Sequence, residues 1–506
     1  MSLPKKHFRA TAKLLRALDK DEVANWLLNH GYYPEQYVLP PSFNVTDFKL
    51  KGKPYIKDLR DPGRRQLTSI SYPKSLLTSR VFGIQHPFNY HDIVYWIIND
   101  WDTIIDHLFD SHLKIFSYSL PIPVNAKTTG QLSSLRSGRM IYEWVEMAEK
   151  DMVAEAHKFS LLIRADITNF YNSVYTHSIG WAIYGREEAF RDKEWSLTGN
   201  KIDRLIQYAN DGRTNGIPVG SALSDLIAEI ILSSIDRKVS LKLKDIDFIG
   251  SRFKDDYRIL CNTQQDANII LKELADELVS FNLLINEHKT KVLTLPEGLY
   301  RHHDRQYHPH SLKDKSTIPF KTFELTLLKA LDIHKAFPGT SILEKFFSEL
   351  YTDAQKLKIE FSCETNTRRK QLLKTMSLLM LLKRESEKVI CHVLAVCEAI
   401  YNEYRTKTLR EQIRGLVESE IKKASEKRSV FELVWLVFFS RYIGLGITDF
   451  AALIAKENMT NPFLKSIITG QQKIYPDSKV DLFKKPRDCR GGSLVKRLAV
   501  FDRGKE

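Results

Sequence analysis

Three aspartates in this sequence could act together in phosphoryl-transfer chemistry. Asp255 and Asp256 are adjacent and lie within a predicted hairpin over residues 246–262, whereas Asp166 ends an apolar run far upstream. Carboxylates on a strand end and a neighbouring hairpin can hold two Mg²⁺ ions, which bind the attacking and leaving oxygens of a displacement. We predict such a site for nucleotidyl transfer, with Mg²⁺ or Mn²⁺. The backbone carbonyl of Ile167 would complete the first ion's ligands, and Asp256 would ligate or tune the ions.

An isolated Asp-Asp pair is more often two solvated acids in a tight turn, so the flanking residues decide the interpretation. Tyr171 follows Asp166 by five residues. Its ring can lie under the sugar of an incoming nucleotide and clash with a 2′-hydroxyl, which would select deoxynucleotides. Phe170 beside it is a second candidate for nucleotide contact.

A glycine-rich turn over residues 215–224 precedes a predicted helix and favours the same chemistry. Glycine lets the backbone approach a base or sugar closely, so this turn can shape a nucleotide pocket. Its candidate nucleotide-binding residues are Gly216, Pro218, Val219, Gly220 and Ser221. Further along the chain, Lys289 could neutralise or protonate a departing pyrophosphate.

The elements that position these residues predict an α+β fold. Between residues 159 and 295 the pattern predicts, in order, a strand (159–166), two helices (175–190 and 220–240), the hairpin, a helix (265–281) and a strand (290–295). Helices on one side of an antiparallel sheet would place the acids at the strand ends.

From about residue 320 onward, apolar residues recur at three- and four-residue spacing, which predicts a helical array. The predicted helices cover 323–336, 341–358, 367–384, 387–405, 408–424, 428–443 and 448–456. Taken alone, this half is best interpreted as a packed helical bundle or solenoid that scaffolds or binds and performs no chemistry.

The composition favours a polyanionic partner and excludes several classes of protein. The 506 residues carry a net charge of +14, which suits nucleic acid or nucleotides. The 5 cysteines lack CxxC spacing, so neither a zinc site nor a disulfide framework is indicated. The longest apolar run, 433–439, is too short to cross a bilayer, and the amino terminus does not resemble a secretory signal. We therefore expect a cytoplasmic protein without a membrane partner.

In order and spacing, the blocks around Asp166, Gly216, Asp255 and Lys289 resemble motifs A to D of the reverse transcriptase palm. Residues 79–90 are similar to a fingers segment of prokaryotic members. The resemblance covers about residues 20–295. It implies that Lys74 and Arg80 sit near the triphosphate of a bound deoxynucleoside triphosphate.

Within that family, three phrases look most like the abortive-infection (Abi) polymerases of phage defence. These are Gly31-Tyr32-Tyr33-Pro34-Glu35-Gln36, Tyr175-Thr176-His177-Ser178-Ile179 and Asp255-Asp256-Tyr257-Arg258-Ile259. The resemblance implies a helical, HEAT-like domain in place of the thumb, and homo-oligomers. It also implies single-stranded DNA made without a template and attached covalently to a tyrosine. The expected domains are fingers and palm at 1–300 with a short helical lead-in, a linker at 301–320, and a helical domain at 321–506 with a basic tail.

Two positions depart from the pattern of templated reverse transcriptases. Val219 stands where they generally have a glutamine that helps to position the nucleotide, which favours a relaxed or absent template requirement. Phe253-Lys254 replaces a tyrosine and a small or apolar residue, so the metal ligands are intact but the pocket is altered. A templated enzyme, as in retrons or mobile introns, and a non-catalytic nucleic-acid-binding scaffold stay open as alternatives.

No motif marks one of the 21 tyrosines as a primer. Tyr32, Tyr33 and Tyr37 lie in a proline-flanked loop that could reach an active site, although such a tyrosine is more often a half-buried packing aromatic. The histidines near residues 302–310 lack the acids or cysteines of a metal site, and a polar linker is the simpler interpretation.

Overall fold

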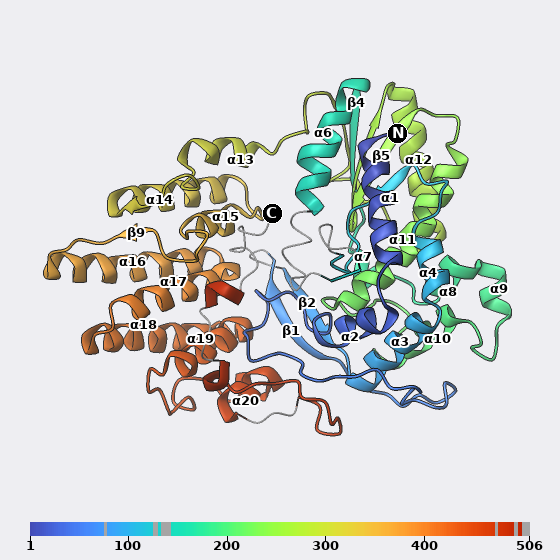
Figure 1. The fold of residues 1–506 in the computed structure, drawn as a ribbon. Coiled ribbons are helices and arrows are strands. Elements are labelled where there is room, and N and C mark those ends of the chain that lie inside the picture. The colour runs from blue at the N-terminus through green and yellow to red at the C-terminus, as the bar shows by residue number, and fades with distance from the viewer. Residues whose placement is uncertain (75–77, 125–129, 133–142, 471–473, 490–493, 498–506) are drawn as a thin grey trace.

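The fold has two halves, one built around β-sheets and one of helices (Figure 1). The computed structural model describes residues 1–74, 78–124, 130–132, 143–470, 474–489 and 494–497. Much of the predicted basic tail therefore lies outside the described residues. In the described part of the chain, no helix combines the length and apolar character needed to cross a membrane.

A five-stranded sheet forms the centre of the first half, and its strand order is β3-β5-β6-β4-β7. The strands are β3 (Ile115–Ser117), β4 (Leu161–Asp166), β5 (Phe248–Phe253), β6 (Asp256–Cys261) and β7 (Lys291–Thr294). All neighbours pair antiparallel except β3 and β5, which are parallel. The predicted hairpin and both predicted strands are present, and the α+β prediction is confirmed.

Helices pack against this sheet and supply most of its core. The longest, α11 (Ala222–Lys242), is buried on every side over its first four turns and is capped by the Ser221 hydroxyl, which accepts from the Ser224 amide. Beside it lies α12 (Gln264–Ser280), capped by Thr263. The helix predicted over 175–190 is split into α8 (Ser178–Tyr184) and α9 (Arg186–Arg191) at Gly185, whose φ is 85°.

One helix of this half, α10 (Thr198–Ala209), was not predicted. It begins with Thr-Gly-Asn, residues of weak helix propensity. Its stability comes instead from Ile202, Leu205 and Ile206, which are fully buried. Tertiary burial therefore overrides the local preference.

The amino-terminal region surrounds a small hairpin. Helices α1 (Leu3–Arg16) and α2 (Lys20–Asn29) precede it, and α3 (Pro87–Asn99) and α4 (Trp101–Leu108) follow. The hairpin consists of β1 (Thr68–Pro73) and β2 (Ser79–Ile84), paired antiparallel. In Figure 1 it lies between the two halves of the protein.

The second half is a stack of helices, as predicted. Its members are α14 (Phe320–Ala336), α15 (Ile342–Glu349), α16 (Thr365–Glu385), α17 (Ile390–Glu403), α18 (Lys407–Glu426), α19 (Val430–Ile443) and α20 (Pro462–Thr469). Two boundaries differ from the prediction. The helix predicted over 341–358 stops at Glu349, and the chain then forms β9 (Ile359–Glu360), which pairs with β8 (Ile318–Pro319). Residues 448–456 contain turns and no helix, and the next α-helix starts only where Asn461 caps α20.

Residues 301–320, predicted as a linker, join the halves but are packed. They include α13 (His302–Tyr307), whose Tyr307 is buried and donates to Glu349 at 3.0 Å. The Leu312 amide donates to the same carboxylate at 2.8 Å. This segment is thus anchored to α15.

The helical half also packs directly on the hairpin and the amino-terminal segment. Phe431 of α19 meets the Tyr72 ring edge-on, with centroids 5.1 Å apart. Tyr475 accepts from the Thr68 amide at 3.0 Å, and Trp435 donates to the Val38 carbonyl at 3.3 Å. These contacts tie the two halves together through the hairpin.

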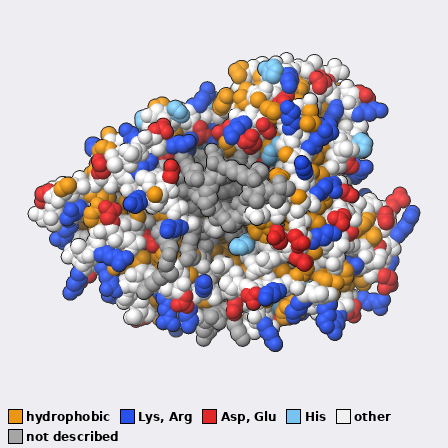
Figure 2. Space-filling view, viewed as in Figure 1, with side chains coloured by type: hydrophobic (Ala, Val, Ile, Leu, Met, Phe, Trp, Pro, Cys, Tyr) orange, Lys and Arg blue, Asp and Glu red, His pale blue; other side chains and the backbone are white. Residues whose placement is uncertain are grey.

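The positive charge is not gathered in one visible patch. Figure 2 shows Lys and Arg side chains over both halves of the visible face, with Asp and Glu among them. The net charge of +14 therefore does not by itself locate a binding surface.

Candidate active site

The sheet register brings the three predicted acids together. Strand β4 ends at Asp166, β6 begins at Asp256, and these two residues are partners in the ladder. Asp255 lies in the two-residue turn between β5 and β6. Asp166 is buried, Asp255 half-buried and Asp256 exposed. Their carboxylates thus share one end of the central strands.

Mutual repulsion is visible in the pKa values of this group. Although part of the Asp256 residue is exposed, partial removal of its carboxylate from water raises its pKa to about 7, and the charges of Asp255 and Asp166 contribute to the rise. Burial also raises the pKa of Asp255, and the charge of Asp166 adds to the effect. Crowded carboxylates of this kind carry negative charge that a divalent cation would compensate.

The donor set suits magnesium, although the side chains are not yet arranged around an ion. Within the described ranges, no group of three or more His, Cys, Asp or Glu side chains has a metal-holding arrangement. Instead, Asp166 accepts from the Lys289 ammonium at 2.9 Å and from the Asn286 amide at 3.3 Å. An ion here would take the place of Lys289 at this carboxylate.

Lys289 is held beside the acids by the segment that follows α12. The Asn286 amide donates to the Asp166 carbonyl at 2.7 Å, and the Thr168 amide donates to the Leu284 carbonyl at 2.8 Å. Burial lowers the pKa of Lys289, but the hydrogen bond and charge of Asp166 outweigh that effect, so the net shift is upward. Lys289 therefore stays charged at the site.

Tyr171 lies next to the acids, on the short helix α7 (Phe170–Ser173). Its hydroxyl donates to a carboxylate oxygen of Asp225 at 2.5 Å. Burial raises the pKa of Tyr171, and the charges of Asp225 and Asp255 raise it further. The ring of buried Phe170 packs against it, with centroids 5.2 Å apart.

The glycine-rich turn lies between α7 and the β1–β2 hairpin. The Gly216 amide donates to the Val174 carbonyl at 2.8 Å, and the Ile217 amide to the Tyr171 carbonyl at 2.9 Å. On its other side, the Val219 carbonyl accepts from the Gly83 amide at 3.1 Å. Pro218 lies against Gly83, Gly220 against Phe82, and Ser221 caps α11. The turn therefore fixes the hairpin relative to Tyr171.

Of the two predicted cations of the hairpin, Arg80 is the one that the described contacts bring near the acids. It is exposed on β2. Its charge lowers the pKa of Asp255, whereas burial and the charge of Asp166 raise that pKa. Lys74 follows β1 and is exposed, and its amide donates to the Thr78 carbonyl at 2.9 Å. No described contact links Lys74 to the acids.

Lys388 of the helical half is a further cation beside the hairpin. It was not predicted from the sequence. The pKa of Lys388 is lowered, mainly because the side chain is buried. The charge of Glu344 opposes this shift, and the like charges of Arg80 and Lys74 add to it. These three cations are therefore neighbours. Local sequence could not reveal this, because Lys388 is far from the hairpin in the chain.

With this geometry known, the comparison with protein families is informative. The sequence matches the family described as "Reverse transcriptase (RNA-dependent DNA polymerase)" over residues 112–317, which contain all three acids, Tyr171 and Lys289. Residues 112–317 are therefore similar to a reverse transcriptase domain. The family is one of nucleotidyl-transferring enzymes that use divalent metal, nucleotides and nucleic acid. No curated protein matches the sequence.

Solved telomerase structures show only a distant likeness. Apo telomerase from Candida tropicalis is 14% identical with a TM-score of 0.32, and the alignment covers 76% of this chain and 69% of that one. A form of it truncated from the C-terminal domain is 15% identical with a TM-score of 0.28, covering 49% and 52%. Telomerase from Candida albicans with a TWJ fragment of telomeric RNA is 11% identical with a TM-score of 0.30, covering 73% and 64%. This chain thus spans about half the length of the truncated enzyme. TM-scores this low carry no argument about the fold.

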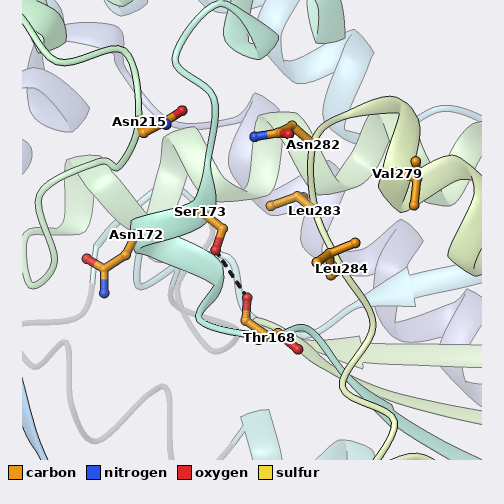
Figure 3. Close-up of a pocket in the computed structure, with 8 residues that line it drawn as sticks. All are labelled: Thr168, Asn172, Ser173, Asn215, Val279, Asn282, Leu283 and Leu284. Carbon is orange, nitrogen blue, oxygen red and sulfur yellow. Dashed lines mark hydrogen bonds between the residues drawn. The ribbon is translucent and has the colours of Figure 1, made fainter.

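The region that matches the reverse transcriptase family also has a pocket close to the end of β4. Its volume is about 390 Å³, and Figure 3 shows its lining from α7 and the loop before it, the glycine-rich turn, the end of α12 and the segment that follows. The lining residues are Thr168, Asn172, Ser173, Asn215, Val279, Asn282, Leu283 and Leu284. None of the predicted site residues is among them.

The predicted priming tyrosines differ in accessibility. Tyr32 and Tyr33 are buried, and their hydroxyls donate to the carbonyls of Gln85 and Leu482 at 2.5 and 2.7 Å. Burial raises the pKa of both phenols well above the ordinary value. Tyr37 is half-buried against Tyr72. In this conformation, Tyr37 is the most accessible of the three.

Magnesium is expected to raise the melting temperature more at pH 8 than at pH 6. The pKa of Asp256 is 3.8 in the unfolded chain and about 7 in the folded protein. Between these two pH values the folded protein therefore binds more protons than the unfolded chain. Stability from this group therefore falls as pH rises through that window. At pH 8 the ionised carboxylates bind Mg²⁺, whereas at pH 6 protons compete. Thermal unfolding with Mg²⁺ or with EDTA measures the difference.

The matched variant for this experiment is Asp256→Asn, which removes the titrating group. It should reduce the extra stabilisation by Mg²⁺ at pH 8. An equal Mg²⁺ effect at both pH values in the wild type would contradict the metal assignment.

Proposed function

We propose that this protein is a metal-dependent DNA polymerase of reverse transcriptase type that acts in phage defence. It makes single-stranded DNA without a template and attaches it to one of its own tyrosines. The observation that carries the proposal is the meeting of Asp166, Asp255 and Asp256 at one end of β4 and β6, with Tyr171 beside them. That arrangement suits nucleotidyl transfer to a deoxynucleotide.

In the proposed reaction, a hydroxyl oxygen attacks the α-phosphorus of a deoxynucleoside triphosphate in line. The new P–O bond forms as the bond to the bridging oxygen breaks, the hydroxyl proton is lost, and pyrophosphate leaves. Asp166, the Ile167 carbonyl, Asp255 and Asp256 would hold Mg²⁺, which supplies charge stabilisation at the attacking and leaving oxygens.

The remaining residues bind and orient the nucleotide. Tyr171 lies under the sugar, and the glycine-rich turn contacts the base side of the pocket. Arg80, with Lys74, faces the triphosphate. Lys289, once released from Asp166, is placed to stabilise the departing pyrophosphate because its ammonium is already at the site.

Two features support synthesis without a template. Val219 offers an apolar side chain where a glutamine would donate and accept hydrogen bonds, and its carbonyl accepts from the Gly83 amide. The helical half, residues 321–506, packs on the β1–β2 hairpin through α19 and Tyr475. We propose that it is a HEAT-like replacement for the thumb.

The primer is proposed to be a tyrosine hydroxyl of a homo-oligomer. The resemblance to Abi polymerases supports both points, and the accessibility of Tyr37 makes it the first candidate to test. Tyr32 and Tyr33 would have to leave buried hydrogen bonds before reacting.

A labelling experiment tests the proposal. Purified protein is incubated with Mg²⁺ and labelled deoxynucleotides, without added nucleic acid, and is run on a denaturing gel before and after nuclease treatment. We expect label that migrates with the protein and collapses to protein size after nuclease. Protein with Asp255→Asn is the inactive control. Tyr37→Phe then asks whether that hydroxyl carries the label.

A templated RNA-directed DNA polymerase is the second candidate, because the matching family is described by that activity. It predicts incorporation only when RNA is added, with products whose sequence follows that RNA. No incorporation under either condition would leave a nucleic-acid-binding scaffold.

A further inference from the structure

The turn that carries Asp255 has an unusual residue in an unusual conformation. Lys254 has a φ of 55°, in the left-handed region that residues other than glycine adopt infrequently. Two backbone hydrogen bonds hold it there. Its amide donates to the Ser119 hydroxyl at 2.8 Å, and its carbonyl accepts from the Arg252 guanidinium at 3.1 Å.

A buried ionic network fixes both of those partners. The Ser119 hydroxyl donates to Glu229 at 2.6 Å, and Arg252 donates to Glu229 at 2.9 Å and to Asp236 at 2.8 Å. All four of these side chains are buried, and both carboxylates belong to α11. The turn that carries Asp255 is therefore attached rigidly to α11.

The Lys254 side chain makes a second connection from the same turn. Its ammonium donates to one oxygen of Asp225 at 3.3 Å, and the other oxygen of Asp225 accepts from the Tyr171 hydroxyl at 2.5 Å. Asp225 is buried and lies in the first turn of α11. One carboxylate thus joins the catalytic turn to the tyrosine that faces the sugar.

We propose that Lys254 and Asp225 are positioning residues that set the preference for deoxynucleotides over ribonucleotides by holding Tyr171 in place. The inference rests on the proposed polymerase function and deepens it. A ring tethered at its hydroxyl cannot swing aside for a 2′-hydroxyl. A ring without that tether rotates about its side-chain bonds and admits the ribose.

The pair has the properties that such a tether requires. Asp225 is only 5% exposed at its side chain and Lys254 30%, so solvent screens their attraction little. A hydrogen bond from a phenol to a charged carboxylate is stronger than one between neutral groups. Lys254, which the sequence showed only as a departure from other reverse transcriptases, is thus connected through Asp225 to Tyr171.

The experiment compares kcat/KM for dATP and ATP. Lys254→Met keeps the length and apolar stem of the side chain but removes the ion pair, and Tyr171→Phe removes the hydroxyl but keeps the ring. Each is expected to lower the dATP-to-ATP ratio by roughly tenfold, as one charged hydrogen bond is lost. The double variant should fall no further, because each change breaks one of the two links in the same chain from the turn through Asp225 to Tyr171.

Two control variants accompany the test. Lys254→Arg keeps the charge and should retain most of the wild-type ratio. Lys272→Met, at an exposed position of α12, removes a lysine elsewhere in the domain and should change nothing. Thermal unfolding of each variant confirms that it is folded.

The outcomes separate the inference from the proposed function. If the wild type incorporates neither nucleotide, the polymerase proposal and the inference both fail. If the wild type is active and Lys254→Met and Tyr171→Phe keep its dATP-to-ATP ratio, even with equal losses for both nucleotides, the inference alone is overturned. Lys254 and Asp225 would then serve only to hold the fold.

Discussion

Replacing Asp255 with asparagine is expected to lower deoxynucleotide incorporation by roughly 10³-fold or more, equivalent to about 4 kcal/mol of transition-state stabilisation. The change is nearly isosteric, but it removes a charge from the carboxylate group that Mg²⁺ would bind. Because Asp255 is in a turn and half-buried, little packing is lost. Steady-state incorporation of labelled deoxynucleotides measures the effect.

The same substitution should also lower the repulsion among the acids. Asp255 is one of the charges that raise the pKa of Asp256, so the folded protein without metal should be no less stable than the wild type. Asp276→Asn, at an exposed position of α12, is the matched control and should retain full activity. Loss of folding in Asp255→Asn, or retained activity, would contradict the assigned role.

The placement of the three candidate acids at strand ends could be predicted from sequence because it depends on local features. Asp166 ends an apolar strand, and Asp255-Asp256 lies between two apolar segments, so both belong at strand ends. The sheet register confirms that Asp166 and Asp256 are partners. Short-range pattern and the rules of sheet topology are sufficient for such a prediction.

The residues that tether the site could not be predicted in the same way. Asp225 occurs in the first turn of a predicted helix, where an acidic side chain usually stabilises the helix by its interaction with the helix dipole. Its contacts with Tyr171 and Lys254 depend on where distant segments meet. Lys388 is a further example, because only the packing of the helical half brings it near the hairpin.

In the helical half, whole elements as well as single residues could be predicted only in part from the sequence. Its three- and four-residue periodicity located most of the helices. It failed over 448–456, where apolar residues are buried in turns instead of a helix. The docking of Tyr475 and Trp435 on the hairpin and amino-terminal segment has no local signal at all.

Gly220→Ala is expected to eliminate most of the activity and to destabilise the first half of the protein. Gly220 has a φ of 123°, and a Cβ there would lie 2.6 Å from the buried ring of Phe82 and 3.1 Å from Pro34. Backbone strain and overpacking together should cost about 3 kcal/mol. The turn can relieve the clash only by moving away from the hairpin, which displaces the contact between Val219 and Gly83.

Urea-induced unfolding and the incorporation assay measure the two effects of Gly220→Ala separately. The matched control is Gly52→Ala, because a Cβ at Gly52 has no atom within 4 Å and its backbone needs no positive φ. That variant should be as stable and active as the wild type. A Gly220→Ala protein with wild-type activity would mean that the glycine turn does not fix the hairpin relative to Tyr171. Because the turn hydrogen-bonds both elements, we expect activity to be lost even where the variant remains folded.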